Sequence, residues 1–404
     1  MAGEEAGLKQ LNRHRVRLAA ICIALFSAAT AGQTPAVPFL WIWPTARSTG
    51  LAGAMVALAD DPDAAYWNPG GLGFQRTLGG SQSYAQWLPG LYPGMYYAHG
   101  SYGFGLPATG AKHQRANVGI NWTYLTTGET DVINEQGQFL GRYTTWDGAF
   151  GIHAGLALSD LIGVGVNLQY IHSHLVPDWV CETMPELGIS GGGSGSGFAA
   201  DFGALYKPWS FLNVGLSVAN LGPDFTYVAP GVSDPMPRIL RAGVCFTPTS
   251  IPVFQPAEDF FRARVMVQMD QPLLAPITGL RSAWKSFAVE GTFVQVISLR
   301  CGYFEDLTGA RGGFEVEREG SATRRIGLWD VLTRNDFGRV RSVGLCFGLG
   351  IGYKDYLRFD VSSDAHIYDF KTNNWKLSLT VNDVGGVFNE IVEGNSGFDW
   401  MQIP

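Results

Sequence analysis

The sequence predicts an all-β protein: a transmembrane antiparallel β-barrel of about 14 strands, with an N-terminal hatch segment inside the lumen. Three observations favour this fold class. First, segments of roughly ten residues alternate between apolar and small or polar side chains, as strands with two unlike faces do. Second, only 16% of the residues are charged, against ~25% in an ordinary soluble protein, while the chain holds 53 Gly, 12 Trp, 15 Tyr and 24 Phe. Third, the chain begins with an export signal and has no other long apolar run.

Residues 1–31 are the predicted signal peptide. Basic residues between Lys9 and Arg17 precede the apolar run 18–31, and Ala29-Thr30-Ala31 offers a cleavage site with small residues before Gly32. An uncleaved membrane anchor is the weaker alternative, because the run is shorter than the about 20 residues of a spanning helix. We therefore expect export through a cleaved signal peptide to the cell outer membrane, with outer-membrane lipid as a partner.

Residues 32–76 do not alternate, so they are not expected in the barrel wall. The stretch 51–58 could form a short helix, and turns are predicted at 60–63 and 68–71. A large barrel has an interior that is either water-filled or plugged, and a small segment rich in Ala and Gly suits that interior. We expect this hatch to place Arg47 beside Asp201 or Asp360.

Residues 77–382 are the predicted barrel. In its clearest strand, apolar residues from Val343 to Tyr353 alternate with Gly and Cys. A soluble β-sandwich is the alternative, but its solvent face would be rich in Lys and Glu, whereas the second face here is mostly Gly, Ala, Ser and Asn. The predicted strands are 78–87, 94–101, 116–125, 146–158, 161–172, 196–207, 211–220, 238–247, 262–270, 284–291, 295–303, 341–353, 355–363 and 375–382.

Connection lengths test this count, since such barrels have short periplasmic turns and longer extracellular loops. The turns near 159–160, 207–210, 291–293 and 354 are short, and the outside connections 173–195, 221–237 and 304–340 are long. The connections 102–115 and 248–261 are too long for periplasmic turns, which leaves 12 or 16 strands open as alternatives. Residues 383–404 are expected to form a periplasmic tail.

Alternation also places a set of polar residues in the lumen. One interpretation is that they bond to one another and to the hatch, because buried polar groups need partners. The other is that they form a solute path or binding pocket. The predicted set contains Asp201, Arg241, Arg264, Arg300, Arg358 and Asp360, together with Asn121, His153, Asn167, Gln169, Gln268 and Lys376.

The chain shows no motif for catalysis, metals or nucleic acid. Asp60, Asp61 and Asp63 lack the spacing and final Glu of a calcium loop, so a capping and turn role is expected. His172 and His174 have no third ligand nearby in the sequence. No Gly-x-Ser-x-Gly motif is present, and the formal net charge of −7 disfavours nucleic acid. We expect neither an enzyme nor a cofactor.

The predicted hatch carries a family pattern. The run from Ala36 to Leu40, then Pro44 and Arg47, the stretch 50–59, and Tyr66-Trp67-Asn68-Pro69 resemble the PorV/PorQ family of FadL-like outer-membrane barrels. Gly70 stands where the family usually has Ala. The residues that we take as the hatch motif are Pro38, Phe39, Arg47, Gly50, Asp61, Pro62, Trp67, Asn68 and Pro69.

The resemblance implies a fourteen-stranded barrel with an internal hatch and a role in protein secretion. A PorV-like protein of the type IX secretion system would bind the C-terminal sorting domains of secreted cargo. It would shuttle this cargo from the secretion translocon to a surface attachment complex. Strand addition at the connection 304–340 is one way to bind such a domain. A FadL-like transporter of hydrophobic solutes and a PorQ-like relative of unassigned role are the alternatives.

Overall fold

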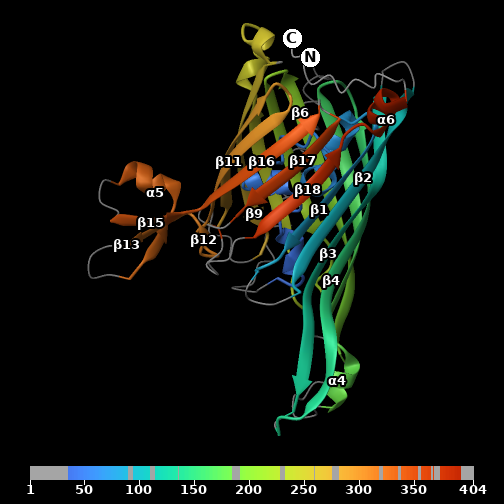
Figure 1. Cartoon of the computed structure of the whole chain (residues 1–404), viewed down its shortest axis with the longest axis vertical. Helices are drawn as coiled ribbons and strands as arrows, with labels where there is room; N and C mark the ends of the chain where they lie inside the picture. The colour runs from blue at the N-terminus through green and yellow to red at the C-terminus, as the bar shows by residue number, and fades with distance from the viewer. Residues whose placement is uncertain are drawn as a thin grey trace, which may run out of the picture.

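Fourteen antiparallel strands close into a barrel in a computed structural model of the chain (Figure 1). The structure describes residues 35–89, 94–109, 114–134, 136–183, 192–227, 233–258, 260–274, 282–317, 322–334, 338–353, 356–364, 367 and 374–392. Each strand pairs with its neighbour in the chain, except that β11 pairs with β16, and β1 pairs with β18 to close the ring. The predicted count of fourteen is therefore confirmed. The predicted signal peptide and the end of the predicted tail lie outside the described residues.

The barrel strands have these bounds: β1 Leu78–Gln86, β2 Tyr96–Thr109, β3 Gln114–Ile133, β4 Phe139–Ala157, β5 Ile162–Val176, β6 Gly193–Trp209, β7 Leu212–Leu221, β8 Ile239–Phe246, β9 Phe261–Pro272, β10 Trp284–Phe293, β11 Ile297–Asp306, β16 Leu345–Tyr353, β17 Leu357–Ser363 and β18 Trp375–Val381.

The outer face of the barrel is apolar, and its inner face is small and polar. Along β18, Leu377 and Leu379 are exposed while Lys376, Ser378 and Thr380 are buried. The same alternation recurs on β4, β5 and β16. A lipid-facing band with a polar interior is the arrangement of outer-membrane barrels. Within the described residues, no helix is long and apolar enough to span a membrane.

Aromatic side chains gather near both ends of the barrel. On β1 to β4, Tyr84, Tyr96, Tyr124 and Trp146 contact one another in turn, with ring centroids 5.7–6.0 Å apart. At the opposite end, Trp209 stacks on Phe211, and Phe261 lies 4.8 Å from Phe293. Such girdles mark the two interfaces of a bilayer with water.

The two ends of the barrel differ in their connections. The short-turn end holds the turns 158–161, 210–211 and 294–296, and it also holds the start of β1 and the end of β18. The long-loop end holds the other connections between barrel strands, including 177–192 and 307–344. The predicted connection 102–115 was wrong, because β2 continues to Thr109 and leaves only a short link. The connection 247–260 is long, as its sequence suggested, and contains the short helices η4 Pro248–Ser250 and η5 Gln255–Ala257.

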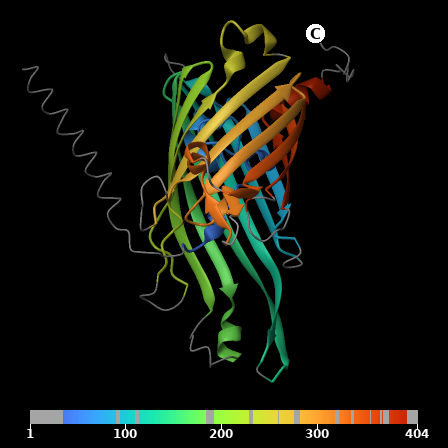
Figure 2. The ribbon, with the colours of Figure 1, turned by 90° about the vertical axis from the view of Figure 1, so that its left-hand side faces the viewer.

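Two structures extend from connections of the long-loop end: a hairpin continues along the barrel axis, and a small sheet stands out from the side of the barrel (Figures 1 and 2). The β3–β4 hairpin continues far past Thr126, the last residue of β3 that pairs with β2, and α4 Asp178–Thr183 packs beside it. Between β11 and β16, a small sheet is formed by β13 Phe314–Glu317, β14 Arg324–Ile326 and β15 Arg339–Val343, with α5 Leu328–Thr333. The two-residue strand β12 Arg311–Gly312 precedes it. Residues 341–343 therefore lie in this sheet and not in the predicted barrel strand.

The chain after the barrel begins with a helix at the short-turn end. This helix, α6 Val384–Val392, starts three residues after β18 (Figure 1). The predicted tail thus begins as a helix, and residues 393–404 lie outside the described part of the chain.

Candidate functional site

The most elaborate polar site of the protein joins the N-terminal segment, residues 35–76, to the barrel wall. The segment starts at the long-loop end, where Ala36 N donates to Pro235 O. It ends at the short-turn end, where Thr77 Oγ1 donates to Asn382 O. Nearly all of its residues from 36 to 73 are buried, and they contact inward-facing residues of strands around the barrel.

Local sequence chemistry folds this segment into short helices. They are η1 Pro38–Trp41, α2 Ala46–Gly50, α3 Ala64–Trp67 and η2 Pro69–Phe74. Thr45 caps α2, because its Oγ1 accepts from Ser48 N while Ser48 Oγ accepts from Thr45 N. Gly53 has a φ of 78°, which ends any continuation of this helix. The predicted helix at 51–58 was therefore wrong: the helix lies just before it, where the capping residues are.

Gly50 lets α2 lie directly on the barrel wall. A Cβ atom at this position would be 2.9 Å from the Cα atom of Gly348 on β16. Two glycines facing each other bring the helix backbone within van der Waals contact of the strand. This close approach places the neighbouring Arg47 side chain among the charged residues of the wall.

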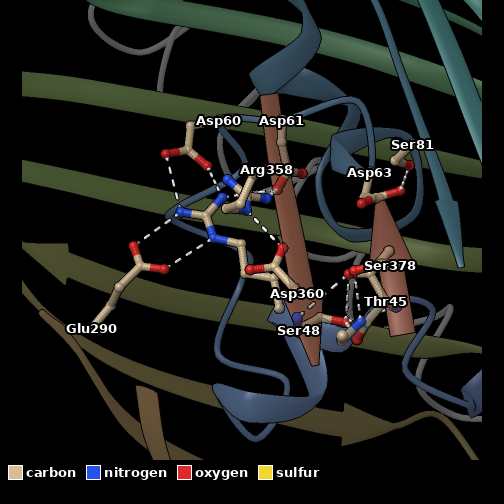
Figure 3. Close-up of polar contacts among 12 residues, drawn as sticks. Thr45, Ser48, Asp60, Asp61, Asp63, Ser81, Glu290, Arg358, Asp360 and Ser378 are labelled. Atoms are coloured by element: carbon tan, nitrogen blue, oxygen red, sulfur yellow. Dashed lines mark hydrogen bonds and ion pairs between the residues drawn. The ribbon is translucent and has the colours of Figure 1, made fainter. Parts of the chain in front are cut away.

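The buried Arg47 is the centre of an ion cluster. Figure 3 labels its partners Asp60, Asp61 and Glu290, together with Arg358 and Asp360. The Arg47 guanidinium contacts Asp61 Oδ2 at 2.8 Å and Asp60 Oδ1 at 2.5 Å within the segment. It also donates twice to Glu290 of β10, from Nε and Nη2, both at 3.1 Å. The bidentate pair fixes the segment to the wall through a planar, charge-assisted contact.

Four strands complete this cluster. Arg264 of β9 and Arg300 of β11 contact Glu290 at 2.8 and 2.6 Å. Arg300 and Arg358 of β17 hold Asp360, both at 2.7 Å, and Arg358 also reaches Asp61 at 3.2 Å. We call this set the arginine cluster, and its members are Arg47, Asp60, Asp61, Arg264, Glu290, Arg300, Arg358 and Asp360. Four arginines face four carboxylates, so the cluster has no net charge.

The cluster corrects two expectations. Arg47 pairs with Asp60, Asp61 and Glu290, whereas Asp360 pairs with Arg300 and Arg358, and Asp201 is elsewhere. Asp60 and Asp61 are ion-pair partners, which goes beyond the turn role expected of them. Glu290 was missed, although alternation along β10 puts it on the lumen face with Ser286 and Ala288.

The opposite side of the lumen is joined to the segment by uncharged groups. Asn68 Nδ2 donates to Val56 O at 2.7 Å and to Ala204 O of β6 at 2.9 Å, and its Oδ1 accepts from Gly70 N. Ser217 Oγ of β7 donates to Trp67 O at 2.7 Å. Pro69 begins η2, which packs against β4, β5 and β6. Buried backbone groups of the segment thus find partners on the wall.

The other predicted site residues lie along the same interface. Pro38 and Phe39 are in η1 at the long-loop end, where Phe39 is buried in an apolar cluster while Pro38 is exposed, and Pro62 O accepts from Ser101 Oγ. Arg241 donates to Tyr66 O and stacks on the rings of Tyr66 and Trp67. Asp201 accepts from Asn167, Gln169 and the backbone of Asn220, and has no contact with the segment among its hydrogen bonds to described residues.

The rest of the predicted lumen set is buried. Gln268 accepts from Val56 N at 2.7 Å, and Lys376 donates to Trp43 O. Asn121 bonds to His153 and Asn167. Within the described part of the chain, no group of three or more metal-ligating side chains occurs, and His172 and His174 bond instead to Ser196 and Ser194.

Comparisons with known proteins place these features in context. A family model described as type IX secretion system protein PorV matches residues 27–250. A search of curated proteins found no match.

Several solved barrels are similar to the chain, at low identity. They include the Ralstonia pickettii toluene transporter TbuX (10% identity, 84% of this chain and 97% of that one, TM-score 0.44) and the P. putida toluene transporter TodX (8%, 84% and 97%, 0.43). A Pseudomonas aeruginosa FadL homologue matches at 11% identity over 84% of this chain and 98% of that one, with a TM-score of 0.39. The family model covers more than half of the chain, and the protein therefore belongs to the PorV family of type IX secretion outer-membrane proteins.

Proposed function

We propose that this protein is a cargo carrier of the type IX secretion system. In this role it binds the C-terminal sorting domains of secreted proteins and shuttles them from the translocon to a surface attachment complex. The proposal rests on the family membership, together with the filled lumen and the projecting long-loop end. The N-terminal segment serves as the hatch, and the signal peptide is removed at residue 31.

The state of the lumen is the observation that carries this proposal. A conducting barrel needs an open or movable interior, whereas here a buried segment is tied to the wall by the arginine cluster on one side and by Asn68 on the other. Releasing it would separate buried charges, which costs about 3–5 kcal/mol for one such pair alone. We therefore expect a protein partner to bind to the outer surface of the barrel and not inside its lumen.

The long-loop end offers that surface. Among the described residues, β3 beyond Thr126 forms a ladder only with β4, which leaves its other edge available to a further strand, and Ile133 and Phe139 are exposed near the tip. The small sheet adds exposed Trp329 and Leu332 on α5. Strand edges and exposed apolar side chains are the features that bind β-rich partners. Because the longer loops of outer-membrane barrels are extracellular, this end faces the cell exterior in our proposal.

A FadL-like transporter of hydrophobic solutes is supported less well. Such a protein needs a pathway of low polarity through or beside the hatch. The interior here contains eight charged side chains in the arginine cluster, in addition to the polar groups around Asn68 and Asp201. The charge pairing that holds the segment disfavours this alternative.

The test is a pull-down with the full-length tagged chain, extracted from the outer membrane in mild detergent. We expect co-purification of a large translocon barrel and of secreted proteins that share a C-terminal domain. Replacing residues 314–343 by a short Gly-Ser link should reduce cargo recovery. The matched control replaces residues 248–258 at the short-turn end by the same link and should retain cargo.

Recovery of neither partner by the intact chain, with normal secretion in a deletion strain, would rule the proposal out. Equal loss of cargo in both loop variants would show that cargo does not bind at the long-loop end.

A further inference from the structure

The short-turn end contains a cavity of about 500 Å³ that the proposed function does not use. It lies between Leu58 and Asp60 of the N-terminal segment, the turns after β4 and β6, and the connection 247–260. Its size falls within the ~300–1,000 Å³ of small-molecule pockets. It opens toward water at the end of the barrel opposite the projecting hairpin.

The charges around this cavity are matched except for one. Glu258 pairs with Arg262 at 3.2 Å, and Asp160 pairs with Arg115 at 3.6 Å. Asp60 and Arg264 belong to the arginine cluster, which is already neutral.

Lys207 of β6 is the exception. It lies on the cavity wall with its Nζ 4.0 Å from the centre of the Phe74 ring, and among the described residues it forms no ion pair with a carboxylate. Asp60 on the same cavity wall attracts it, but this carboxylate is already paired with Arg47 and Arg264. A half-buried ammonium that has no ion-pair partner of its own and faces a polar cavity favours an anionic ligand.

The surroundings of Lys207 select the kind of anion. The arginines nearby already hold carboxylates, so they do not offer the free bidentate donors that phosphate prefers. The uncharged wall carries hydroxyl and amide groups of Ser210, Asn213, Thr247 and Ser250, while Leu161 and Trp209 add apolar surface. Donors, acceptors and apolar contacts in this combination suit the backbone and side chains of a short peptide.

We propose that this cavity binds a carboxylate carried by a short peptide, with Lys207 as its ion-pair partner. The site is independent of cargo binding, because it is at the other end of the barrel. A bound carboxylate would also lie near Arg264, which contacts Asp60 of the N-terminal segment at 3.4 Å. The occupant would therefore touch the edge of the arginine cluster.

The experiment measures peptide binding by the purified full-length chain in detergent micelles. The probe is a fluorescein-labelled tetrapeptide of three alanines and a C-terminal aspartate with free carboxylates. Its binding is measured by fluorescence polarisation. Lys207→Met, which keeps the aliphatic stem over Phe74, should weaken binding by about tenfold or more, since a charge-assisted contact is lost. Lys207→Arg should retain most of the affinity. The matched control Arg142→Met removes an equal charge from the distant β3–β4 hairpin and should change nothing.

Asn213→Asp provides a second, independent variant, because an added carboxylate in the cavity should repel the probe. Folding of each variant is checked by its heat-dependent shift in gel mobility. The proposal is overturned if the intact chain does not bind the probe, if an amidated all-alanine peptide binds equally well, or if Lys207→Met and Arg142→Met behave alike. Displacement of the probe by inorganic phosphate at lower concentration than by acetate would overturn the assignment to a carboxylate.

Discussion

Replacing Arg47 by Met tests whether the arginine cluster holds the N-terminal segment in place. Arg47, Asp61 and Glu290 are each no more than 2% exposed, so solvent screens their interaction little. The substitution keeps an unbranched apolar stem and removes the charged guanidinium. The cluster then has three arginines against four carboxylates, a net charge of −1 in a buried site.

The expected loss follows from the contacts that remain. Removing one partner of a buried ion pair costs about 3–5 kcal/mol. Glu290 keeps Arg264 and Arg300, and Asp61 keeps Arg358, so we expect about 3 kcal/mol, the lower end of that range. The free energy of unfolding is measured by urea titration in phospholipid vesicles, with tryptophan fluorescence as the signal.

Two variants make this measurement decisive. Arg142→Met breaks contacts to Glu129 and Asp131 on the exposed hairpin and should cost far less than Arg47→Met, because solvent screens an exposed ion pair. Arg47→Met combined with Glu290→Gln restores the balance, at three charges of each sign, and should be more stable than Arg47→Met alone. Equal losses for Arg47→Met and Arg142→Met would refute the reasoning, as would a double variant that is less stable than the single one.

Three further predictions use the same unfolding measurement. Gly50→Ala should cost ~1–3 kcal/mol, because its Cβ would press on the backbone of Gly348, while Gly385→Ala in α6 should stay within ~0.5 kcal/mol. Asn68→Ala should cost ~1–3 kcal/mol, since the carbonyls of Val56 and Ala204 lose their donor, whereas Asn134→Ala at the hairpin turn should change stability by less than ~0.5 kcal/mol. Leu349→Arg on the lipid-facing side of β16 should cost ~2–4 kcal/mol, and Leu332→Arg on α5, where the side chain is 70% exposed, should cost almost nothing. Any pair with equal losses would contradict the assignment of that position.

The barrel was predictable because period-two alternation directly reports two unlike environments. A lipid face demands apolar residues at every second position, and β16 and β18 show this pattern plainly. The extension of β3 and β4 past Thr126 continues beyond the aromatic residues of that end, where we expect no lipid to impose the pattern. The helix α2 was misplaced for a related reason: its start is set by Thr45 and Ser48, whose capping bonds are local, while the apolar run at 51–58 reflects burial in the lumen.

The arginine cluster was only half predictable. Alternation put Arg264, Arg300, Arg358 and Asp360 on the inner face, and the strand around Glu290 carried the same signal. Their partners depend on the height of each residue in the barrel and on the path of the N-terminal segment. Neither is encoded in the spacing along a single strand, so the pairing of Arg47 required the three-dimensional structure.

The distribution of charge explains how the segment can be both buried and fixed. On the side of β9, β10, β11 and β17, arginines and carboxylates cancel, so no isolated ion is left in the interior. On the side of β4, β5 and β6, glycines and Asn68 bring backbone against backbone without any charge. Moving the segment would break both contacts at once: buried ions would lose their partners, and buried carbonyls would lose their donors. A barrel held in this way is better suited to carry a partner on its rim than to pass one through its centre.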